Sequence, residues 1–337
     1  MNRGVALGRG LLVTLATPPT WPLALAAFLI RGGIILLVIP IVVVPTPVGL
    51  GNVFGPTLTA LALGQVPLQA VVGAGLAGLT VVAWLFGGGW LAAALEAEGA
   101  RIVATDAGVA GGRPLASDAG PVVDRTARAG GSVASRILAA RLAAAIPLVL
   151  VVAWASFRLV VTTYNELTAP RDVTTPIVLR VLAATPEVVV AVVLAWMTGE
   201  IVGAIAARRI ALHGDGVGRS LLAAAGECLR HPLSVLGRFW IPTVVLGLVV
   251  VASAAASAAA WSATGDALAD GRDPLRILVS VVALVVVFAV GLILLGVACA
   301  WRAAIWTIAE AVREGTFGGS TDRRSGDWRT EGSSATL

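Results

Sequence analysis

Long apolar stretches without charge dominate the chain. Residues 32–95 contain no Asp, Glu, Lys, Arg or His, and similar stretches recur as far as Trp301. Divided at charged and turn-forming residues, the pattern predicts six helices, each near the ~20 residues that a bilayer core requires, at 22–44, 66–95, 142–163, 185–209, 239–261 and 275–303. We therefore expect an all-α integral membrane protein with six transmembrane helices.

Composition excludes a water-soluble fold. Mean hydropathy is +0.92 and 58% of the 337 residues are hydrophobic, more than a soluble domain of this length can bury. The remaining segments, chiefly loops near 96–141 and 207–238, are too short for a soluble catalytic domain. We expect one polytopic transmembrane domain over residues 1–314 and a disordered cytoplasmic tail over 315–337, which is rich in Ser, Thr, Gly and mixed charge.

The arginines predict the orientation, since the chain contains no lysine. Eighteen of the 24 arginines lie on one side of the six-span topology, in the N-terminal segment and in 101–141, 208–238 and 302–329. The positive-inside rule places this side, with both termini, in the cytoplasm, and we expect a multi-pass protein of the bacterial cytoplasmic (inner) membrane. Arginines that face anionic lipid headgroups explain the pI near 10.7 without a nucleic-acid partner.

An internal repeat organises the predicted helices. Gly8-Arg9-Gly10-Leu11-Leu12 precedes Pro22-Leu23 by the spacing with which Gly218-Arg219-Ser220-Leu221-Leu222 precedes Pro232-Leu233. Arg, a short amphipathic run and a proline before a span predict cytoplasmic interfacial helices at about 3–17 and 218–231, each leading into a transmembrane hairpin.

A degenerate third copy of this unit begins near Arg125, with its proline displaced to Pro147. Tryptophans that follow alanine late in the second, fourth and sixth spans (Trp84, Trp196 and Trp301) also favour three units of interfacial helix plus hairpin. Chance matches in a sequence rich in Ala and Val are the alternative.

The pattern of Arg, Leu-Leu and Pro-Leu at Arg9 to Leu23 and at Arg219 to Leu233, with six spans over most of the chain, carries a resemblance. It resembles a broad group of uncharacterised bacterial six-helix membrane proteins, some related to the membrane domain associated with glycerophosphodiester phosphodiesterases. The resemblance implies a six-helix membrane fold. Because this chain lacks the phosphodiesterase domain of such relatives, the resemblance implies neither hydrolase activity nor catalytic residues.

Charged residues inside the spans are the candidate functional residues, because a charge in hydrocarbon is costly and is usually paired or functional. Arg31 lies in the first span, before Gly32-Gly33, where a neighbouring helix or water can approach. It is either a structural cation that snorkels or pairs with a carboxylate, or part of a transport path. Glu187 would match its depth if the fourth helix began at Pro176. We favour a helix that starts with Thr185 as its cap, which makes Glu187 a capping residue.

Glu200 lies in the inner half of the fourth span, between Gly199 and Gly203, which allow close helix contact. Arg302 is at a compatible depth near the inner end of the sixth span. We expect a Glu200–Arg302 ion pair that clamps these helices together; the alternative is a proton-titrating or ligand-gating carboxylate.

Motifs for catalysis, cofactors and metals are not found in the sequence. His213 and His231 lack metal-ligand spacing, and there is no phosphate-binding loop, nucleophile elbow or paired-carboxylate motif. We expect no enzyme activity, no cofactor and no metal. Cys228 is predicted on the cytoplasmic side and Cys299 buried in the last span, so a disulfide between them is not expected.

The apolar connection at 45–65 contains many helix breakers. It is either a re-entrant loop that lines a cavity or an outer loop packed on the helix ends.

Two functions fit these features. A small-molecule or lipid transport component is favoured, because repeats, intramembrane charges and a Gly/Pro-rich apolar loop are features of transporters. The alternative is a non-catalytic structural or regulatory subunit, with other membrane proteins as partners beside the lipid bilayer. A wet cavity that reaches Arg31 would favour transport, whereas Arg31 buried dry against another side chain would favour a subunit.

Overall fold

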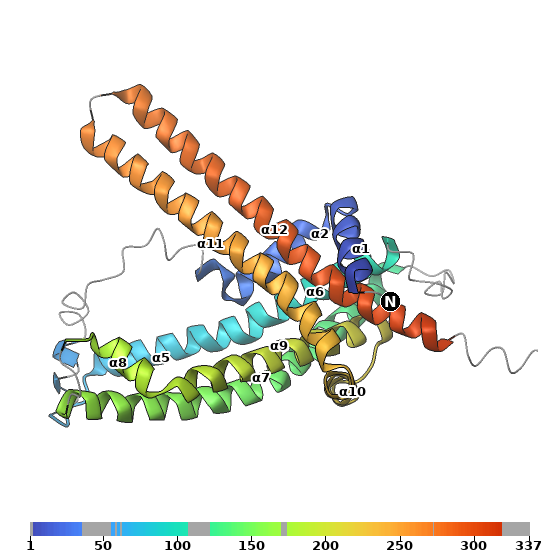
Figure 1. Cartoon of the computed structure of the whole chain (residues 1–337), viewed down its shortest axis with the longest axis horizontal. Helices are drawn as coiled ribbons and strands as arrows, with labels where there is room; N and C mark the ends of the chain where they lie inside the picture. Colours follow the sequence, from blue (N-terminus) through green and yellow to red (C-terminus); the bar gives the residue numbers. More distant parts are fainter. Residues whose placement is uncertain are drawn as a thin grey trace, which may run out of the picture. The chain divides into compact units, whose positions relative to one another are not determined.

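The computed structural model describes residues 3–35, 55–57, 59–60, 63–106, 122–169, 174–271 and 273–318. Every secondary-structure element within these ranges is a helix (Figure 1). Five of the described helical stretches are long and apolar enough to cross a membrane: Leu68–Asp106, Ser132–Thr168, Pro186–His213, Pro232–Asp270 and Pro274–Ala311. A bent pair, Leu7–Ala16 with Thr20–Gly33, adds a sixth if it counts as one span. The predicted all-α membrane fold is confirmed at this level.

The apolar surface of the helices faces outward. Leu79, Leu150, Leu248 and Val285 are all more than half exposed, and α5 (Leu68–Ala83) has no buried residue. Each exposed Å² of such surface costs roughly 25 cal/mol in water, so a continuous surface of this kind needs a lipid environment. The chain is a multi-pass membrane protein.

The helices follow the chain in a simple order. They are α1 (Arg3–Ala16), α2 (Thr20–Phe28), the π-helical segment η1 (Leu29–Gly33), α5, the π-helical segment η2 (Trp84–Gly88), α6 (Gly89–Asp106), α7 (Val122–Thr168), α8 (Ile177–Ala184), α9 (Pro186–His213), α10 (Val217–Arg230), α11 (Pro232–Asp270) and α12 (Pro274–Gly318). Every predicted span falls on these helices, although the first is described only to residue 35. Most of the 45–65 connection, with both of its interpretations, lies outside the described residues.

The helices extend further than the predicted spans. α6 continues to Asp106 and α7 begins at Val122, so much of the loop expected at 96–141 is helical. α12 likewise continues to Gly318, which includes the first residues of the predicted tail; residues 319–337 lie outside the described part of the chain. Charges mark where a helix leaves hydrocarbon, but good helix formers such as Ala, Glu and Arg let the backbone ladder continue into polar surroundings.

Both predicted interfacial segments are separate helices. α1 and α10 match the predicted ranges 3–17 and 218–231, and the axis changes by 108° between Leu7–Ala16 and Thr20–Gly33. The third copy forms no separate helix, because α7 is continuous through Pro147 to Thr168. A proline follows α1 and α10 within a few residues and ends each helix, whereas the displaced Pro147 lies inside the membrane stretch.

The start of the fourth span agrees with the favoured interpretation. α8 is a separate short helix, the backbone breaks at Thr185 (φ −134°), and α9 begins at Pro186 with Glu187 in its first turn. The expected side-chain cap is wrong, however. The hydroxyl of Thr185 donates to the carbonyl oxygen of Val181 at 2.8 Å, so it satisfies α8 instead of α9.

The chain divides into two compact units, which we describe separately. In the unit formed by Met1–Gly120 and Trp240–Ala309, α2 packs on α6, and Leu246, Leu295 and the predicted buried Cys299 form part of an apolar core. In the unit formed by Pro121–Phe239 and Glu310–Leu337, α7 and α9 lie side by side, and α8 and α10 pack against them (Figure 1).

Candidate functional site

Arg31 lies in the π-helical segment η1, where the backbone leaves the regular α-helix. Gly32 has φ +105°, a conformation that side chains other than glycine rarely adopt. A π turn inserts an extra residue into a helix and is frequent at functional sites. Here it accompanies an ion pair in which Arg31 Nη2 donates to Glu96 Oε2 of α6.

The Arg31–Glu96 pair is half-buried on one side only. The side chain of Glu96 is 5% exposed, whereas that of Arg31 is 36% exposed. The second π segment, η2, immediately precedes α6, and a Cβ added at Gly88 would lie 3.2 Å from the side chain of Ile30. Close helix approach therefore occurs at Gly88, not at the predicted Gly32-Gly33, and the structural interpretation of Arg31 as a paired cation is supported.

Glu200 lies near the middle of α9, about 21 Å along the helix from Pro186. Its Oε1 is 3.9 Å from Nη1 of Arg141 on α7, and both side chains are half-buried. An ion pair at this separation has no direct hydrogen bond, so the space between the charges is open to a small polar group or water.

Glycines next to Glu200 bring α7 and α9 together as the sequence predicted. A Cβ at Gly199 would lie 2.8 Å from the carbonyl oxygen of Ala144, closer than atoms can pack. A Cβ at Gly203 would lie 3.4 Å from Cδ of Arg141. The glycines thus form the helix contact from which Arg141 reaches Glu200.

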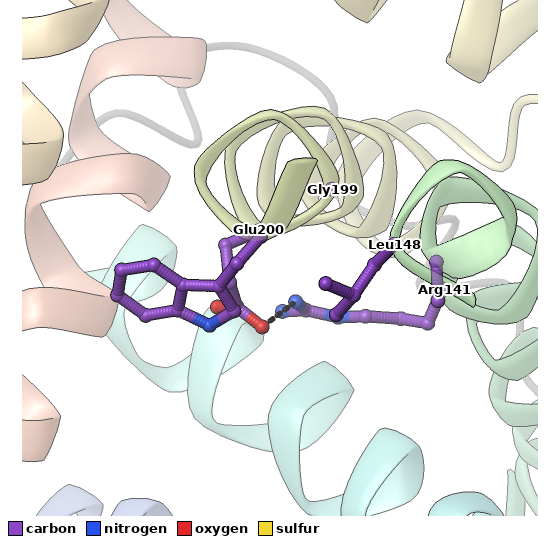
Figure 2. A pocket seen from close by; sticks show the side chains of 6 residues that line it. Arg141, Leu148, Gly199 and Glu200 are labelled. Carbon is purple, nitrogen blue, oxygen red and sulfur yellow. Dashed lines mark ion pairs between the residues drawn. The ribbon is translucent and has the colours of Figure 1, made fainter. Parts of the chain in front are cut away.

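A small pocket surrounds this pair. It is lined by Arg141, Ala145, Leu148, Trp196, Gly199 and Glu200, and its volume is about 60 Å³. Figure 2 shows Arg141 extending from α7 toward Glu200, with Leu148 on the same side of the pocket. The volume exceeds the ~10–15 Å³ that a water molecule requires but is far below the ~300 Å³ of sites for larger ligands. The pocket can hold a few water molecules or one small polar group.

Two further Arg–Glu pairs stabilise the unit that contains α7 and α9. Arg158 on α7 contacts Glu187 on α9 at 3.1 Å, and Arg180 on α8 contacts Glu166 on α7 at 3.4 Å. Arg158 follows Arg141 along α7 whereas Glu187 precedes Glu200 along α9, so the two helices are antiparallel. Glu187 is thus both the first-turn residue that the sequence predicted and the partner of Arg158.

Arg302 is half-buried in α12, in the other compact unit from Glu200. The Glu200–Arg302 clamp therefore stays a prediction. The partners that sequence reasoning missed are Glu96 for Arg31 and Arg141 for Glu200. Among the described residues, no group of three or more His, Cys, Asp or Glu is placed to hold a metal ion.

Fold and site together define an α-helical multi-pass membrane protein with paired charges inside its helical units. Comparison of the chain with protein-family models, with curated proteins and with solved structures found no match.

Proposed function

We propose that the protein is a component of small-molecule or lipid transport in a bacterial cytoplasmic membrane. The observation that carries this proposal is the Arg141–Glu200 pair at the polar pocket between α7 and α9. An ionisable pair is costly in an apolar hairpin, and two hydrophobic residues of similar size would hold the helices at least as well. A separated pair beside a water-sized space is instead suited to contact a polar group that passes along the hairpin.

The proposed topology has six spans with both termini in the cytoplasm. In it, α2 begins the first span, and the five long apolar helical stretches supply the others. The distribution of arginines supports this orientation. Labelling of single cysteines at the exposed positions Asp106 and Asp270, in a chain without Cys228 and Cys299, tests it. The two positions should label from opposite sides of the membrane; labelling from the same side would overturn the topology.

The topology includes a repeated unit of surface helix plus membrane helix. With Arg9 aligned on Arg219, the buried positions of the two surface helices coincide: Gly10, Thr14 and Thr17 in the first copy, and Ser220, Ala224 and Glu227 in the second. Chance similarity between two sequences rich in Ala and Leu does not by itself produce the same pattern of burial. The third copy would retain only the hairpin, since α7 is continuous.

A second candidate function is a structural or regulatory subunit of a membrane complex. Its support is the Arg31–Glu96 pair, because a cation already neutralised by a nearly buried carboxylate is less available to a passing ligand. In this case the partners would be other membrane proteins.

Reconstitution separates the two functions. The purified chain would be placed in vesicles of phosphatidylcholine and phosphatidylglycerol, and translocation of a fluorescent phosphatidylglycerol would be followed by dithionite quenching. A transport component should accelerate translocation, and Glu200→Gln should reduce the acceleration by about tenfold if one charge contact of roughly 1.4 kcal/mol is lost. Glu187→Gln is the matched control, since it removes a carboxylate paired with Arg on the same two helices away from the pocket.

Absence of any acceleration by the wild-type chain would argue against lipid transport. Purification in native lipid, with identification of the copurifying proteins, then tests the subunit. A stoichiometric membrane-protein partner would support that second function.

A further inference from the structure

The faces of α10 are reversed relative to a helix on a water-facing surface. Its buried residues are Ser220, Ala224 and Glu227, on the side that packs against α7 and α9. Glu227 contacts Arg238 at 3.4 Å, so the protein side of the helix holds the hydroxyl and the carboxylate. In a soluble protein the apolar residues of an amphipathic helix would occupy that side.

The outer stripe of α10, by contrast, consists of leucines between arginines. Its members recur at helical spacing and are all exposed: Arg219, Leu222, Leu229, Arg230 and, in the first turn of α11, Leu233. Leu222 is 77% and Leu229 84% exposed. Arg219 lies 3.8 Å from Asp215, yet its side chain remains largely exposed. Solvation of this stripe by water alone would be unfavourable.

α1 presents a similar outer face. Arg9 and Leu12, which align with Arg219 and Leu222, are exposed, and Leu15 continues the face. α1 contains no carboxylate, and the single carboxylate of α10 is buried. The outer faces therefore carry positive charge and apolar area with no acidic side chain, which matches an anionic lipid surface.

The helix directions agree with a position in the membrane plane. α1 is bent by 108° from the helix that follows it, so if that helix crosses the bilayer, α1 lies nearly parallel to the surface. In Figure 1, α10 is seen almost along its axis whereas α7 and α9 run across the view, which places α10 crosswise on these membrane helices.

We propose that the outer stripe of α10, with the equivalent face of α1, is a docking surface for the anionic phospholipid headgroups of one leaflet. Leu222 and Leu229 insert at the level of the upper acyl chains, and Arg219 and Arg230 contact phosphates. This inference holds whether or not the protein transports a substrate, because it concerns how the hairpins are held at the membrane surface.

Spin labels measure the depth of the stripe directly. Single cysteines at Leu222, Leu229 and the exposed control position Gly216 would be labelled in a cysteine-free chain and reconstituted in nanodiscs of phosphatidylcholine with phosphatidylglycerol. Labels at Leu222 and Leu229 should collide more with oxygen than with a water-soluble nickel chelate, and the label at Gly216 should show the opposite. Nickel accessibility at the two leucines equal to that at Gly216 would overturn the proposal. Protection that is found only in native membranes would indicate a protein partner and would also overturn it.

The choice of anionic lipid is tested with the arginines. Preference for spin-labelled phosphatidylglycerol over phosphatidylcholine should fall about fivefold for each of Arg219→Gln and Arg230→Gln, the change expected from loss of one arginine near an anionic surface. Arg276→Gln is the control, because this exposed arginine is already neutralised by Asp270 at 2.8 Å. An unchanged lipid preference in the two stripe variants would contradict the assignment of phosphates to these arginines.

Discussion

Arg31 and Glu96, the two charged residues on either side of the uncharged stretch 32–95, form an ion pair with each other. The chain thus leaves one charge, passes through apolar sequence and returns to the opposite charge in the same compact unit. Because Glu96 is nearly buried, loss of its cation would leave a carboxylate with poor compensation.

Arg31→Gln should therefore destabilise the protein more than Glu96→Gln, since the first leaves a buried charge and the second leaves a neutral amide. We expect a loss of roughly 1–3 kcal/mol for Arg31→Gln, below the range for fully buried pairs because Arg31 is partly exposed. Thermal unfolding in detergent, followed by tryptophan fluorescence, measures the order. Arg101→Gln is the control, as its pair with Glu98 on α6 is exposed and should contribute little. Equal effects of all three substitutions would contradict this account.

Gly199→Ala should separate α7 from α9. The added carbon would meet a backbone oxygen at 2.8 Å, which cannot move as a side chain can, and we expect a loss of about 1–3 kcal/mol. Gly203→Ala should be milder, because its nearest neighbour is the flexible side chain of Arg141. Gly247→Ala on α11, with no atom within 4 Å, serves as the control in the same thermal assay. A Gly199→Ala protein as stable as the control would refute the close contact.

Glu200 should couple energetically to Arg141. A double-mutant cycle with Glu200→Gln and Arg141→Gln should show an interaction of at least about 0.5 kcal/mol. The same cycle with Arg302→Gln tests the clamp predicted from sequence. Strictly additive effects in the first cycle would remove the Arg141 pair from the proposed site, whatever the second cycle shows.

Two tryptophans should hold α1 in place. Trp21 Nε1 donates to the carbonyl oxygen of Thr14 at 2.8 Å, and Trp301 Nε1 donates to that of Leu7 at 3.2 Å. Phenylalanine at either position keeps most of the apolar contact but cannot donate, so hydrogen exchange over residues 7–16 should accelerate by about fivefold for a bond of roughly 1 kcal/mol. Trp261→Phe, at an exposed position of α11, is the control. Unchanged exchange in both variants would show that the indoles do not restrain α1.

Cys228 should react slowly with maleimide near neutral pH. Burial raises the pKa of its thiol above the ordinary value, and the neighbouring Glu227 charge adds to the effect. Both causes disfavour the thiolate, which is the reactive form, so the rate should keep rising with pH beyond the point at which an exposed cysteine at Gly216 has levelled off. Glu227→Gln should increase the rate only modestly, since burial is the larger cause. A faster reaction at Cys228 than at position 216 at neutral pH would contradict this environment.

The membrane helices could be predicted from sequence because hydrocarbon solvation depends on local composition. Helix ends were harder: charges at Arg101 and Arg136 marked the edge of the apolar region, but α6 and α7 continue through these residues. The break at Thr185 was found because proline restricts the local backbone, yet its hydroxyl bonds backward to Val181, a choice that local propensity does not determine.

The ion pairs were harder still, because they depend on which helices meet. Glu200 could be placed at the right depth and next to the right glycines, but Arg141 had been assigned to a surface helix and so was not considered as its partner. For Arg31 a signal was present in the sequence, since a hairpin returns its two ends to the same side of the membrane. Glu96 is the first charged residue after Arg31 and the first that such a return brings to a matching depth.

The π segment η2 ties the position of Glu96 to a single residue of chain length. A π turn accommodates one residue more than an α turn, so deletion of Gly87 would let the helix close into regular α geometry and rotate everything after it by about 100° relative to α5. Glu96 would then no longer face Arg31. In the evolution of this chain, an insertion at this point would have aligned the carboxylate with the guanidinium in one step, and homologues one residue shorter between α5 and α6 should carry the acidic residue at a different helical position or lack Arg31 as well.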